Sequence, residues 1–422
     1  MEKQMTELEF TAKLRQAGAR VFIVGGWVRD LLRHVPAHDK DYMVAGMEEQ
    51  VFEELFPQAQ RVGRAFPVYL VEIDGQHVEV AFARKERKEG TGYRGFAVDY
   101  SRDVTLAEDL YRRDTTMNSM AMELPGGEIF DPYGGRQDVE QGIIRPVSPH
   151  FAEDPVRALR AARQAAEFRF TLVAETKEAM AACRQELAAE PAERLFQELK
   201  RALQTPRPSV FFAALQETNL LAVTFPELAA LIGKIQPEAF HPEGDAFVHT
   251  LLVLDTVAKE TDSPLARFCG LVHDLGKGET PTEMLPHHYD HELRGLDVLK
   301  KWNQRMTLPK KWLQAGLFVI EQHMRAPRLT KPGKIVELLL QVAASPLNIA
   351  EFQAVIRADH HGLPCYLEDA PGILACLQQV NGGQAPKHLR GAEIGAWVRS
   401  RQVKCYQDYD AAKLGKQRYK DQ

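Results

Sequence analysis

The sequence predicts an α+β fold, with a small mixed sheet in the front of the chain and a long, mostly helical body behind it. Four apolar runs of strand-like composition lie within the first 145 residues, between helix-like stretches: VFIVGG, DYMVAG, PVYLVEI and HVEVAFA. From Ser148 the chain becomes rich in Ala, Leu, Glu, Arg and Gln, and its apolar residues follow helical spacing. Strands therefore belong to the front of the chain and helices to the rest.

The length of 422 residues predicts several domains, because one domain usually takes about 100–200 residues. The Pro- and Gly-containing segment GKIQPEAFHPEGDA is typical of a boundary between two helical modules. We expect four parts: a sheet-containing head at 1–145, a helical neck or body at 146–235, an all-α module at 245–362 and a helical tail at 363–422.

Composition indicates a folded globular protein, with 45% hydrophobic and 26% charged residues. The net charge of −5 argues against a surface coated with basic residues for nonspecific nucleic-acid binding. Lys and Arg nevertheless outnumber Asp and Glu at 294–334 and at 387–422. These two runs are either local faces for an RNA backbone or solvated helix faces.

Five scattered cysteines without a C-x-x-C pair suggest neither a zinc knuckle nor a disulfide framework, and they fit a reducing cytoplasm. The opening segment MEKQMTELEF has no apolar signal core, and no window approaches 18 uninterrupted apolar residues. We therefore expect a cytoplasmic protein that is neither secreted nor inserted in a membrane.

The stretch HDKDYMV places Asp39 and Asp41 one residue apart at the edge of an apolar run. On a strand their carboxylates would share one face and repel each other, unless a divalent cation such as Mg²⁺ lay between them. The alternative is a pair of solvated turn residues. Glu79 lies on a predicted strand that can pair with this one, where it is either a third carboxylate or the partner of a nearby cation.

Upstream, VGGWVRDLL joins an apolar strand to a helix through Gly25 and Gly26. Two glycines at such a turn let backbone N–H groups approach a phosphate, and the start of the helix adds partial positive charge. With Arg29 three residues further on, the segment predicts a triphosphate-binding turn beside the metal site.

The segment EDPVRALRAAR predicts a helix that begins at Pro155, with Asp154 as its N-cap. Asp154 and Arg157 are three residues apart and share a face, so together they can present hydrogen-bond acceptors and donors to a base edge. Arg160 follows at the next such step, whereas Arg163 lies half a revolution from Asp154.

In the second half, His273 and Asp274 are adjacent within an apolar helical stretch, so two polar groups would be buried side by side and need partners. Imidazole and carboxylate together suit a transition-metal or Mg²⁺ centre. Further candidates flank this pair, with His249 upstream and Asp359 downstream.

Five ordered motifs resemble the class II tRNA nucleotidyltransferases, the CCA-adding enzymes: GGWVRDLL, DKDYMV, LYRRDTTMNSMAM, DPYGGRQDVEQGIIR and EDPVRALRAARQAAEF. The resemblance implies a head of the polymerase β type in which Asp39 and Asp41 hold two Mg²⁺ ions that activate the RNA 3′-hydroxyl. It also implies that Gly26 and Arg29 bind the incoming triphosphate. Arg113 would contact phosphate or ribose, although the neighbouring Arg112 is an alternative.

The same resemblance implies that Asp154 and Arg157 act as an amino-acid template for cytosine or adenine. Arg160 is then an additional member of the template, and family precedent makes Arg163 a nucleotide contact. The charged, Gly-containing segment RKERKEGTGYRGF reads as a mobile loop. In the CCA-adding enzymes such a loop helps the pocket change from C to A, which disfavours an enzyme that adds only CC.

The ordered set H…HD…D, centred on HDLGK, resembles the HD-domain metal-dependent phosphohydrolases. The resemblance implies that the metal ligands are His249, His273, Asp274 and Asp359, with a divalent transition metal such as Ni²⁺ promoting phosphoester hydrolysis. It also suggests a phosphate contact by Lys277. Four further histidines are candidates for a second metal position, with none preferred: His287, His288, His291 and His323.

Head and HD module together resemble CCA-adding enzymes of enterobacterial type. This implies that the chain builds or repairs the 3′ CCA end of tRNA from CTP and ATP, and has phosphatase, 2′-nucleotidase and 2′,3′-cyclic phosphodiesterase activities. A poly(A) polymerase would share the first five motifs but lack the HD quartet, and an RNA-binding or nucleotide-sensing protein would have lost site residues. The sequence does not decide between a monomer and a homodimer. For residues 363–422 it leaves two alternatives, packing and RNA binding.

Overall fold

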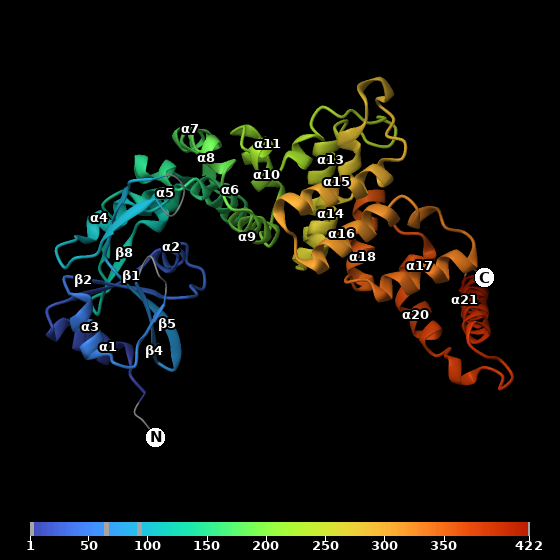
Figure 1. Ribbon diagram of the computed structural model, residues 1–422, viewed down its shortest axis with the longest axis horizontal. Helices are drawn as coiled ribbons and strands as arrows, with labels where there is room; N and C mark the ends of the chain where they lie inside the picture. The colour runs from blue at the N-terminus through green and yellow to red at the C-terminus, as the bar shows by residue number, and fades with distance from the viewer. Residues whose placement is uncertain (1–3, 63–66, 91–94, 421–422) are drawn as a thin grey trace. The chain divides into compact units, whose positions relative to one another are not determined.

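The computed structural model describes residues 4–62, 67–90 and 95–420, which divide into two compact units (Figure 1). The first unit comprises residues 1–198 together with 210–224, and the second comprises residues 199–209 together with 225–422. Strands of the main sheet lie in the first unit, and the second is helical, as the α+β prediction requires.

A mixed seven-stranded sheet organises the first unit, in the order β3-β4-β5-β2-β1-β8-β9. β1 runs antiparallel to both β2 and β8, whereas β2 is parallel to β5. The four predicted strands are confirmed as β1, β2, β4 and β5. The bounds are β1 Arg20–Val24, β2 Asp41–Ala45, β3 Gln60–Val62, β4 Val68–Ile73, β5 Gln76–Phe82, β8 Ala121–Leu124 and β9 Ile129–Phe130.

Two helices, α1 (Glu7–Gln16) and α3 (Glu49–Leu55), lie beside this sheet (Figure 1). Aromatic side chains pack them against it. The ring of Phe52 lies 5.0 Å from Tyr69 on β4 and 5.5 Å from Phe82 on β5. Phe10 of α1 packs edge-on against Tyr42 of β2. Because alternate residues of a strand share a face, this packing fixes which residues of β2 and β5 point away from the core.

The segment predicted as a mobile loop is partly a strand pair: β6 (Lys85–Lys88) runs antiparallel to β7 (Phe96–Asp99). The prediction of a loop was wrong for these residues because they form a hydrogen-bonded strand ladder in which one charged side chain is buried and paired. Glu86 of β6 is buried, and it accepts a hydrogen bond from Arg112 at 2.9 Å. Residues 91–94 of the same segment lie outside the described residues.

The helix that carries the proposed template, α6 (Val156–Phe168), begins one residue later than predicted, with Pro155 rather than Asp154 at the N-cap. Asp154 still accepts a hydrogen bond from the backbone N–H of Val156 at 3.3 Å, so its capping role is retained from outside the helix. Small alanines dominate the buried side of α6, which lets it pack closely in the body of the unit.

The first unit contains further short elements around α6. They are α2 Gly26–Leu32, α4 Leu106–Tyr111, η1 Thr116–Asn118, α5 Gly135–Gln141, β10 Ile143–Ile144, η2 Pro149–Glu153, β11 Thr171–Leu172, α7 Ala174–Ala182, α8 Arg184–Leu187, α10 Ser209–Glu217 and α11 Leu221–Thr224, and α9 Ala192–Leu203 extends into the second unit.

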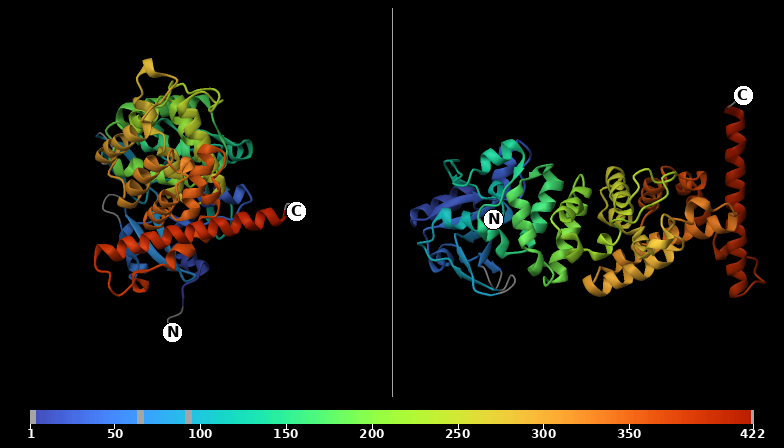
Figure 2. Two further views of the ribbon diagram at one scale, coloured as in Figure 1. Left: turned by 90° about the vertical axis from the view of Figure 1, so that its right-hand side faces the viewer. Right: turned by 90° about the horizontal axis from the view of Figure 1, so that it is seen from above.

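The second unit is a helical assembly, as predicted. Its elements are α12 Pro226–Ala229, α13 Ala246–Glu260, α14 Pro264–Val272, η3 Leu275–Glu279, η4 Thr282–Met284, α15 His291–Met306, α16 Lys310–Gln322, η5 Ala326–Arg328, α17 Pro332–Ala344, α18 Ile349–His360, α19 Cys365–Glu368, α20 Ala370–Gln378, η6 Gly382–Gln384 and α21 Ala392–Lys420. The last of these is a single long helix (Figure 2).

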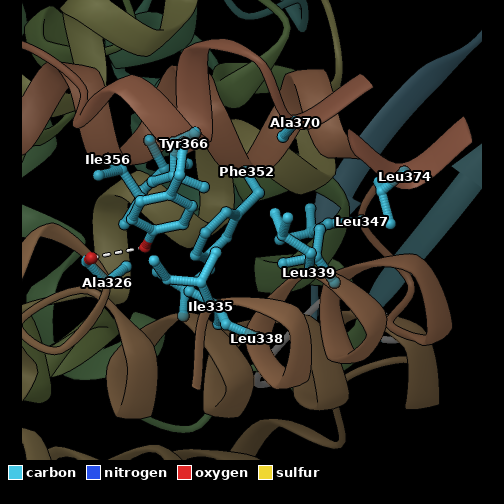
Figure 3. Packing of buried hydrophobic residues seen from close by; sticks show 14 of the residues in the cluster. Ala326, Ile335, Leu338, Leu339, Leu347, Phe352, Ile356, Tyr366, Ala370 and Leu374 are labelled. Atoms are coloured by element: carbon cyan, nitrogen blue, oxygen red, sulfur yellow. Dashed lines mark hydrogen bonds between the residues drawn. The ribbon is translucent and has the colours of Figure 1, made fainter. Parts of the chain in front are cut away.

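A buried apolar cluster joins α17 and α18 to the tail helices (Figure 3). Ile335 and Leu338 of α17 meet Phe352 of α18, and the hydroxyl of Tyr366 on α19 donates a hydrogen bond to the carbonyl oxygen of Ala326 at 2.6 Å. The beginning of the 363–422 segment therefore contributes to packing, which was one of the two alternatives for this region.

The structure contains one disulfide among its described residues, between Cys376 of α20 and Cys405 of α21. One such pair is not a disulfide framework, but the sequence did not predict it, because the two cysteines are 29 residues apart and come together through helix packing, with Cα atoms 6.6 Å apart. The local spacing of the cysteines in the sequence does not predict this pair.

Within the described ranges, no single helix has both the length and the apolar character of a membrane span. Taken together, α17 and α18 pass the same test of length and composition, but they are bent by 118° relative to each other.

We expect Gly276→Ala to destabilise the second unit, because Gly276 of η3 packs directly on the start of α15. A Cβ atom there would collide with the backbone oxygen of His291 and lie 2.5 Å from the backbone nitrogen of Gly295. Overpacking of this kind costs about 1–3 kcal/mol of unfolding free energy. Urea unfolding followed by circular dichroism measures it.

The matched control is Gly395→Ala, at an exposed position of α21 where an added Cβ meets nothing within 4 Å. Alanine favours a helix interior over glycine, so this variant should be neutral or more stable. Equal midpoints for the two variants would contradict the proposed contact between η3 and α15.

Candidate catalytic and metal-binding sites

Strand register builds the first site. Asp41 is the first residue of β2, and it pairs with Val24 on one side and with Glu79 on the other. Because Gly25 follows Val24 directly, three neighbouring strands bring Glu79, Asp41 and the glycine turn into one row across the sheet. The predicted pairing of the strands that carry Asp41 and Glu79 is confirmed.

Asp39 does not lie on the strand, so the prediction that strand alternation places it beside Asp41 was wrong. It precedes β2 and has a left-handed backbone with φ of 55°. This conformation is uncommon for residues other than glycine but is tolerated by Asp. The charge of Asp39 nevertheless contributes to a raised pKa of Asp41.

The pKa of Asp41 is raised above its ordinary value. The largest cause is desolvation by the surrounding protein, and the second is the negative charge of Glu79. Asp39 acts in the same direction, and Arg113 opposes it. Three acidic groups and one guanidinium leave an excess of negative charge on an accessible face of the sheet. A divalent cation with oxygen ligands would compensate this excess, so these residues fit a metal ion.

The glycine turn accommodates two guanidinium groups. Gly25 has φ of 73°, and a Cβ atom there would come within 3.4 Å of Nη1 of Arg113. A Cβ atom on Gly26 would come within 3.3 Å of Nη2 of Arg29. The glycines therefore provide both the required backbone conformation and the space for two positive charges beside Asp41.

Arg29 is held in place by three contacts. Its Nη1 donates a hydrogen bond to Oδ1 of Asn118 at 2.8 Å, and its Nη2 donates to Oδ2 of Asp30 at 2.8 Å. Its guanidinium also stacks on the ring of Phe168, 4.2 Å from the ring centre, where Arg33 joins it. Phe168 ends α6, so α2, which follows the glycine turn, and α6 share this aromatic contact.

Arg112 and Arg113 both bind the buried carboxylate of Asp109, but they point in different directions. Arg112 turns to Glu86 and to the backbone oxygen of Arg84. Arg113 is the one that lies against the glycine turn and acts on Asp41. Of the two arginines, the geometry favours Arg113 as the nucleotide contact.

Asp154 and Arg157 have other partners in this structure. Asp154 accepts a hydrogen bond from Nη2 of Arg194 on α9 at 2.8 Å, and the buried Arg157 donates to the backbone oxygen of His150. Burial lowers the pKa of Arg157, although the nearby charge of Asp154 opposes this effect. Sequence reasoning missed Arg194, because it lies 40 residues from Asp154 and no local spacing links them.

Arg160 and Arg163 share one acidic partner, Glu198 of α9. The Nε atom of Arg163 lies 2.9 Å from Oε2, and the Nε atom of Arg160 lies 3.9 Å from Oε1. The side chain of Arg160 is 40% exposed, against 17% for Arg163. Arg160 is therefore the more accessible of the two arginines on α6. Its positive charge also lowers the pKa of Asp114.

In the second unit, three helices bring together the four predicted HD ligands. His273 and Asp274 follow α14, His249 lies on α13 and Asp359 lies on α18. Nε2 of His249 is 3.2 Å from Oδ1 of Asp359, and Nε2 of His273 is 3.2 Å from Oδ2 of Asp274. All four side chains are buried.

His249 and His273 each form a hydrogen bond through Nδ1 with a group outside the cluster of ligands. Nδ1 of His273 lies 2.8 Å from the backbone oxygen of Gly270, and Nδ1 of His249 lies 2.6 Å from Oε1 of Glu243. Each Nδ1–H can therefore donate outward, which directs Nε2 at the centre, as in metal-bound histidines. Glu243 is a second residue that sequence reasoning missed, although it lies six residues before His249.

A second set of ligands faces the other oxygen of Asp274. Oδ1 lies 3.2 Å from Nε2 of His291 and 3.4 Å from Nε2 of His323. Geometry thus selects two of the four candidate histidines. His288 instead contacts the backbone oxygen of Ile235, and His287 stacks on a tyrosine.

Charge at this centre also fits a cation. Burial alone would lower the pKa of His273, but the carboxylates of Asp274 and Asp359 outweigh it and raise that pKa to about 10. The buried Nε2 of His273, Oδ2 of Asp274 and Oδ2 of Asp359 make no hydrogen bond of good geometry within the described residues. Clustered, unsatisfied imidazole and carboxylate atoms are a donor set suited to divalent metals.

A cavity of about 530 Å³ lies over this centre and reaches Asp274, His291 and Asp359. Lys277 lines it, but its Nζ donates a hydrogen bond to Oε1 of Gln236 at 2.6 Å and pairs with Asp274. Lys277 therefore positions Asp274 in this structure, and a phosphate contact by Lys277 stays a prediction.

Comparison with known proteins gives three family matches in the same order as the structural parts. Residues 21–145 match the poly A polymerase head domain, residues 169–232 match a probable RNA and SrmB binding site of polymerase A, and residues 241–348 match the HD domain. The multifunctional CCA protein of Actinobacillus pleuropneumoniae is 40% identical over 358 residues, which is 81% of this chain and 85% of that protein. The chain belongs to the multifunctional CCA proteins.

Another multifunctional CCA protein, from Nitrosococcus oceani, is 43% identical over 350 residues, covering 81% of this chain and 84% of its own length. Among solved structures, the Bacillus stearothermophilus CCA-adding enzyme in complex with CTP has a TM-score of 0.65 at 24% identity and covers 95% of this chain and 91% of that chain. That similarity establishes a shared fold.

We expect metal-stripped protein to bind divalent metal ions at the HD centre. His323→Ala should remove one of two bound ions, because His323 faces only one oxygen of Asp274, and Asp274→Asn should lose both. Calorimetric titration and direct metal analysis measure the stoichiometry. His388→Ala, at an exposed position of the same unit, is the matched control. If Asp274→Asn bound as many metal ions as the wild type, Asp274 would not be a metal ligand.

Proposed function

We propose that this chain adds or repairs the 3′-terminal CCA of tRNA, using CTP and ATP and no nucleic-acid template, in the cytoplasm. The observation that carries the proposal is the row formed by Glu79, Asp41 and the glycine turn, with Arg29 and Arg113 beside it, in a chain that belongs to the multifunctional CCA proteins.

The residues of the head have distinct tasks in this proposal. Asp39 and Asp41 hold Mg²⁺, which when bound lowers the charge of the triphosphate and activates the 3′-hydroxyl. Gly26 and Arg29 receive the triphosphate, and Arg113 supplies a second positive charge on the same side of the turn. Nucleotidyl transfer needs mainly such positioning and charge compensation, so no further catalytic side chain is required.

Base selection is proposed to rest on Asp154 and Arg157, with Arg160 contributing and Arg163 in a supporting position. Asp154 presents acceptor oxygens, and Arg194 fixes their orientation through its hydrogen bond. Arg157 supplies N–H donors from a buried position at the start of α6. Fixed donors and acceptors can discriminate between bases because an unmatched polar group in a closed site is costly.

The HD centre is proposed to hydrolyse phosphoesters, with phosphatase, 2′-nucleotidase and 2′,3′-cyclic phosphodiesterase activities. His249, His273, Asp274 and Asp359 hold one divalent metal, and His291 and His323 complete a second position with Asp274. The nitrogen-rich donor set favours a transition metal such as Ni²⁺. Bound metal would supply an activated water, and the cavity above the centre receives the phosphoester.

We expect Asp41→Asn to abolish nucleotide addition to tRNA that lacks its CCA end, with a loss of more than about 1,000-fold, because the metal-binding carboxylate is removed. The same variant should retain hydrolysis of 2′,3′-cyclic phosphates. His273→Ala should show the reverse pattern. Incubation with CTP and ATP, separately and together, followed by sequencing gels measures addition.

The two variants serve as controls for each other, since each leaves the other unit intact. Poly(A) tails in the wild-type reaction would favour a poly(A) polymerase instead. A wild-type protein inactive in both assays would favour an RNA-binding or nucleotide-sensing protein.

We expect Arg194→Ala to weaken base selection, because Asp154 would lose the hydrogen bond that orients it. The ratio of kcat/KM for CTP over UTP should fall by about tenfold, which corresponds to about 1.4 kcal/mol. Arg184→Ala, an exposed arginine of the same helical region, is the matched control. An unchanged ratio in Arg194→Ala would separate Arg194 from nucleotide selection.

A further inference from the structure

The cavity over the HD centre has two chemically different ends. Its floor carries the metal-ligand atoms of Asp274, His291 and Asp359, with Lys277 beside them. Arg328 adds a further positive charge to the lining. Such a floor suits a phosphate group, but it gives no reason for the apolar side chains found at the mouth.

Two of those side chains are aromatic and largely exposed. Phe240 is 76% exposed and Tyr289 is 62% exposed, and both line the cavity. The ring of His287 lies 5.5 Å from that of Tyr289 at an interplanar angle of 24°, so Tyr289 already carries one stacked ring. Exposed aromatic groups that line a cavity are typical of ligand contacts rather than of packing.

The two aromatic residues lie on different segments that are held together. Nε2 of His288 lies 3.0 Å from the backbone oxygen of Ile235, and Nζ of Lys234 donates a hydrogen bond to the backbone oxygen of Thr280 at 2.6 Å. The segment that carries Phe240 is therefore tied to the segment that carries Tyr289. Both segments belong to the second unit.

We propose that Phe240 and Tyr289 form a stacking platform for the base of the nucleotide whose phosphate lies at the cavity floor. The proposal rests on the phosphohydrolase function proposed above and assigns the residues that bind the base of its substrates, the nucleoside 2′-phosphates and 2′,3′-cyclic phosphates, free or at an RNA 3′ end. The volume of about 530 Å³ is in the range of sites for ligands of this size. Aromatic faces stack on any base, so this platform selects for a base without selecting which one.

The test compares a substrate that has a base with one that has none. Phe240→Ala and Tyr289→Ala should each raise KM for adenosine 2′,3′-cyclic phosphate by about five- to 100-fold, since one stacking contact is lost. Neither should change hydrolysis of glycerol 2-phosphate, which has no ring. Phe240→Tyr keeps an aromatic face and should keep the wild-type KM. Leu252→Ala removes an exposed apolar side chain that does not line this cavity and is the matched control.

A binding measurement keeps the inference separate from catalysis. A non-hydrolysable phosphonate analogue of adenosine 2′-monophosphate, titrated calorimetrically into metal-loaded protein, should bind Phe240→Ala more weakly than wild type by the same factor. Equal losses for the base-containing and base-free substrates would overturn the platform and make Phe240 a structural residue. A loss confined to RNA ends, with the free nucleotide unaffected, would also overturn it. A wild-type protein that hydrolyses neither substrate would refute the phosphohydrolase function, whereas the binding comparison would still decide the platform.

Discussion

The register of β2 between β1 and β5 is the constraint on which the first unit depends. It sets Asp41 opposite Glu79 on one side and next to the glycine turn on the other. A slip of one residue would turn Asp41 to the opposite face and bury its charge among the aromatic side chains beneath the sheet. Those aromatic contacts therefore do more than stabilise the head, because they hold two repelling carboxylates on its accessible face.

The second unit also brings carboxylates close together, but there hydrogen bonds between side chains and helix ends hold them in place, rather than strand register. Each histidine of the HD centre is fixed through Nδ1 by a group outside the centre, such as Gly270 or Glu243, so its Nε2 has a defined direction. Asp274 receives these Nε2 atoms on both of its oxygens. Helix ends supply most of these positions, which explains why Gly276 must let η3 pack so closely on α15.

The sequence predicted the fold class and the four strands, because those depend on local patterns, whereas the roles of the site residues stay predictions. It failed where long-range packing decides. Asp39 adopts a left-handed backbone before its strand, and Arg194 reaches Asp154 from 40 residues away. The choice of His291 and His323 over their neighbours required the direction of each ring, which no spacing encodes. The pairing of Cys376 with Cys405 likewise follows from two helices that pack together.

Donor chemistry separates the two proposed metal sites within one chain. The head offers carboxylate oxygens on an accessible face of the sheet, a set that suits a hard, hydrated ion such as Mg²⁺. The HD centre offers buried imidazole nitrogens around a shared carboxylate, a set that favours a transition metal. Because the preferences differ and the donors belong to different units, both sites can be filled at once without competing for the same ion. Each site then controls its own phosphorus chemistry, one forming a phosphodiester bond and the other hydrolysing phosphoesters.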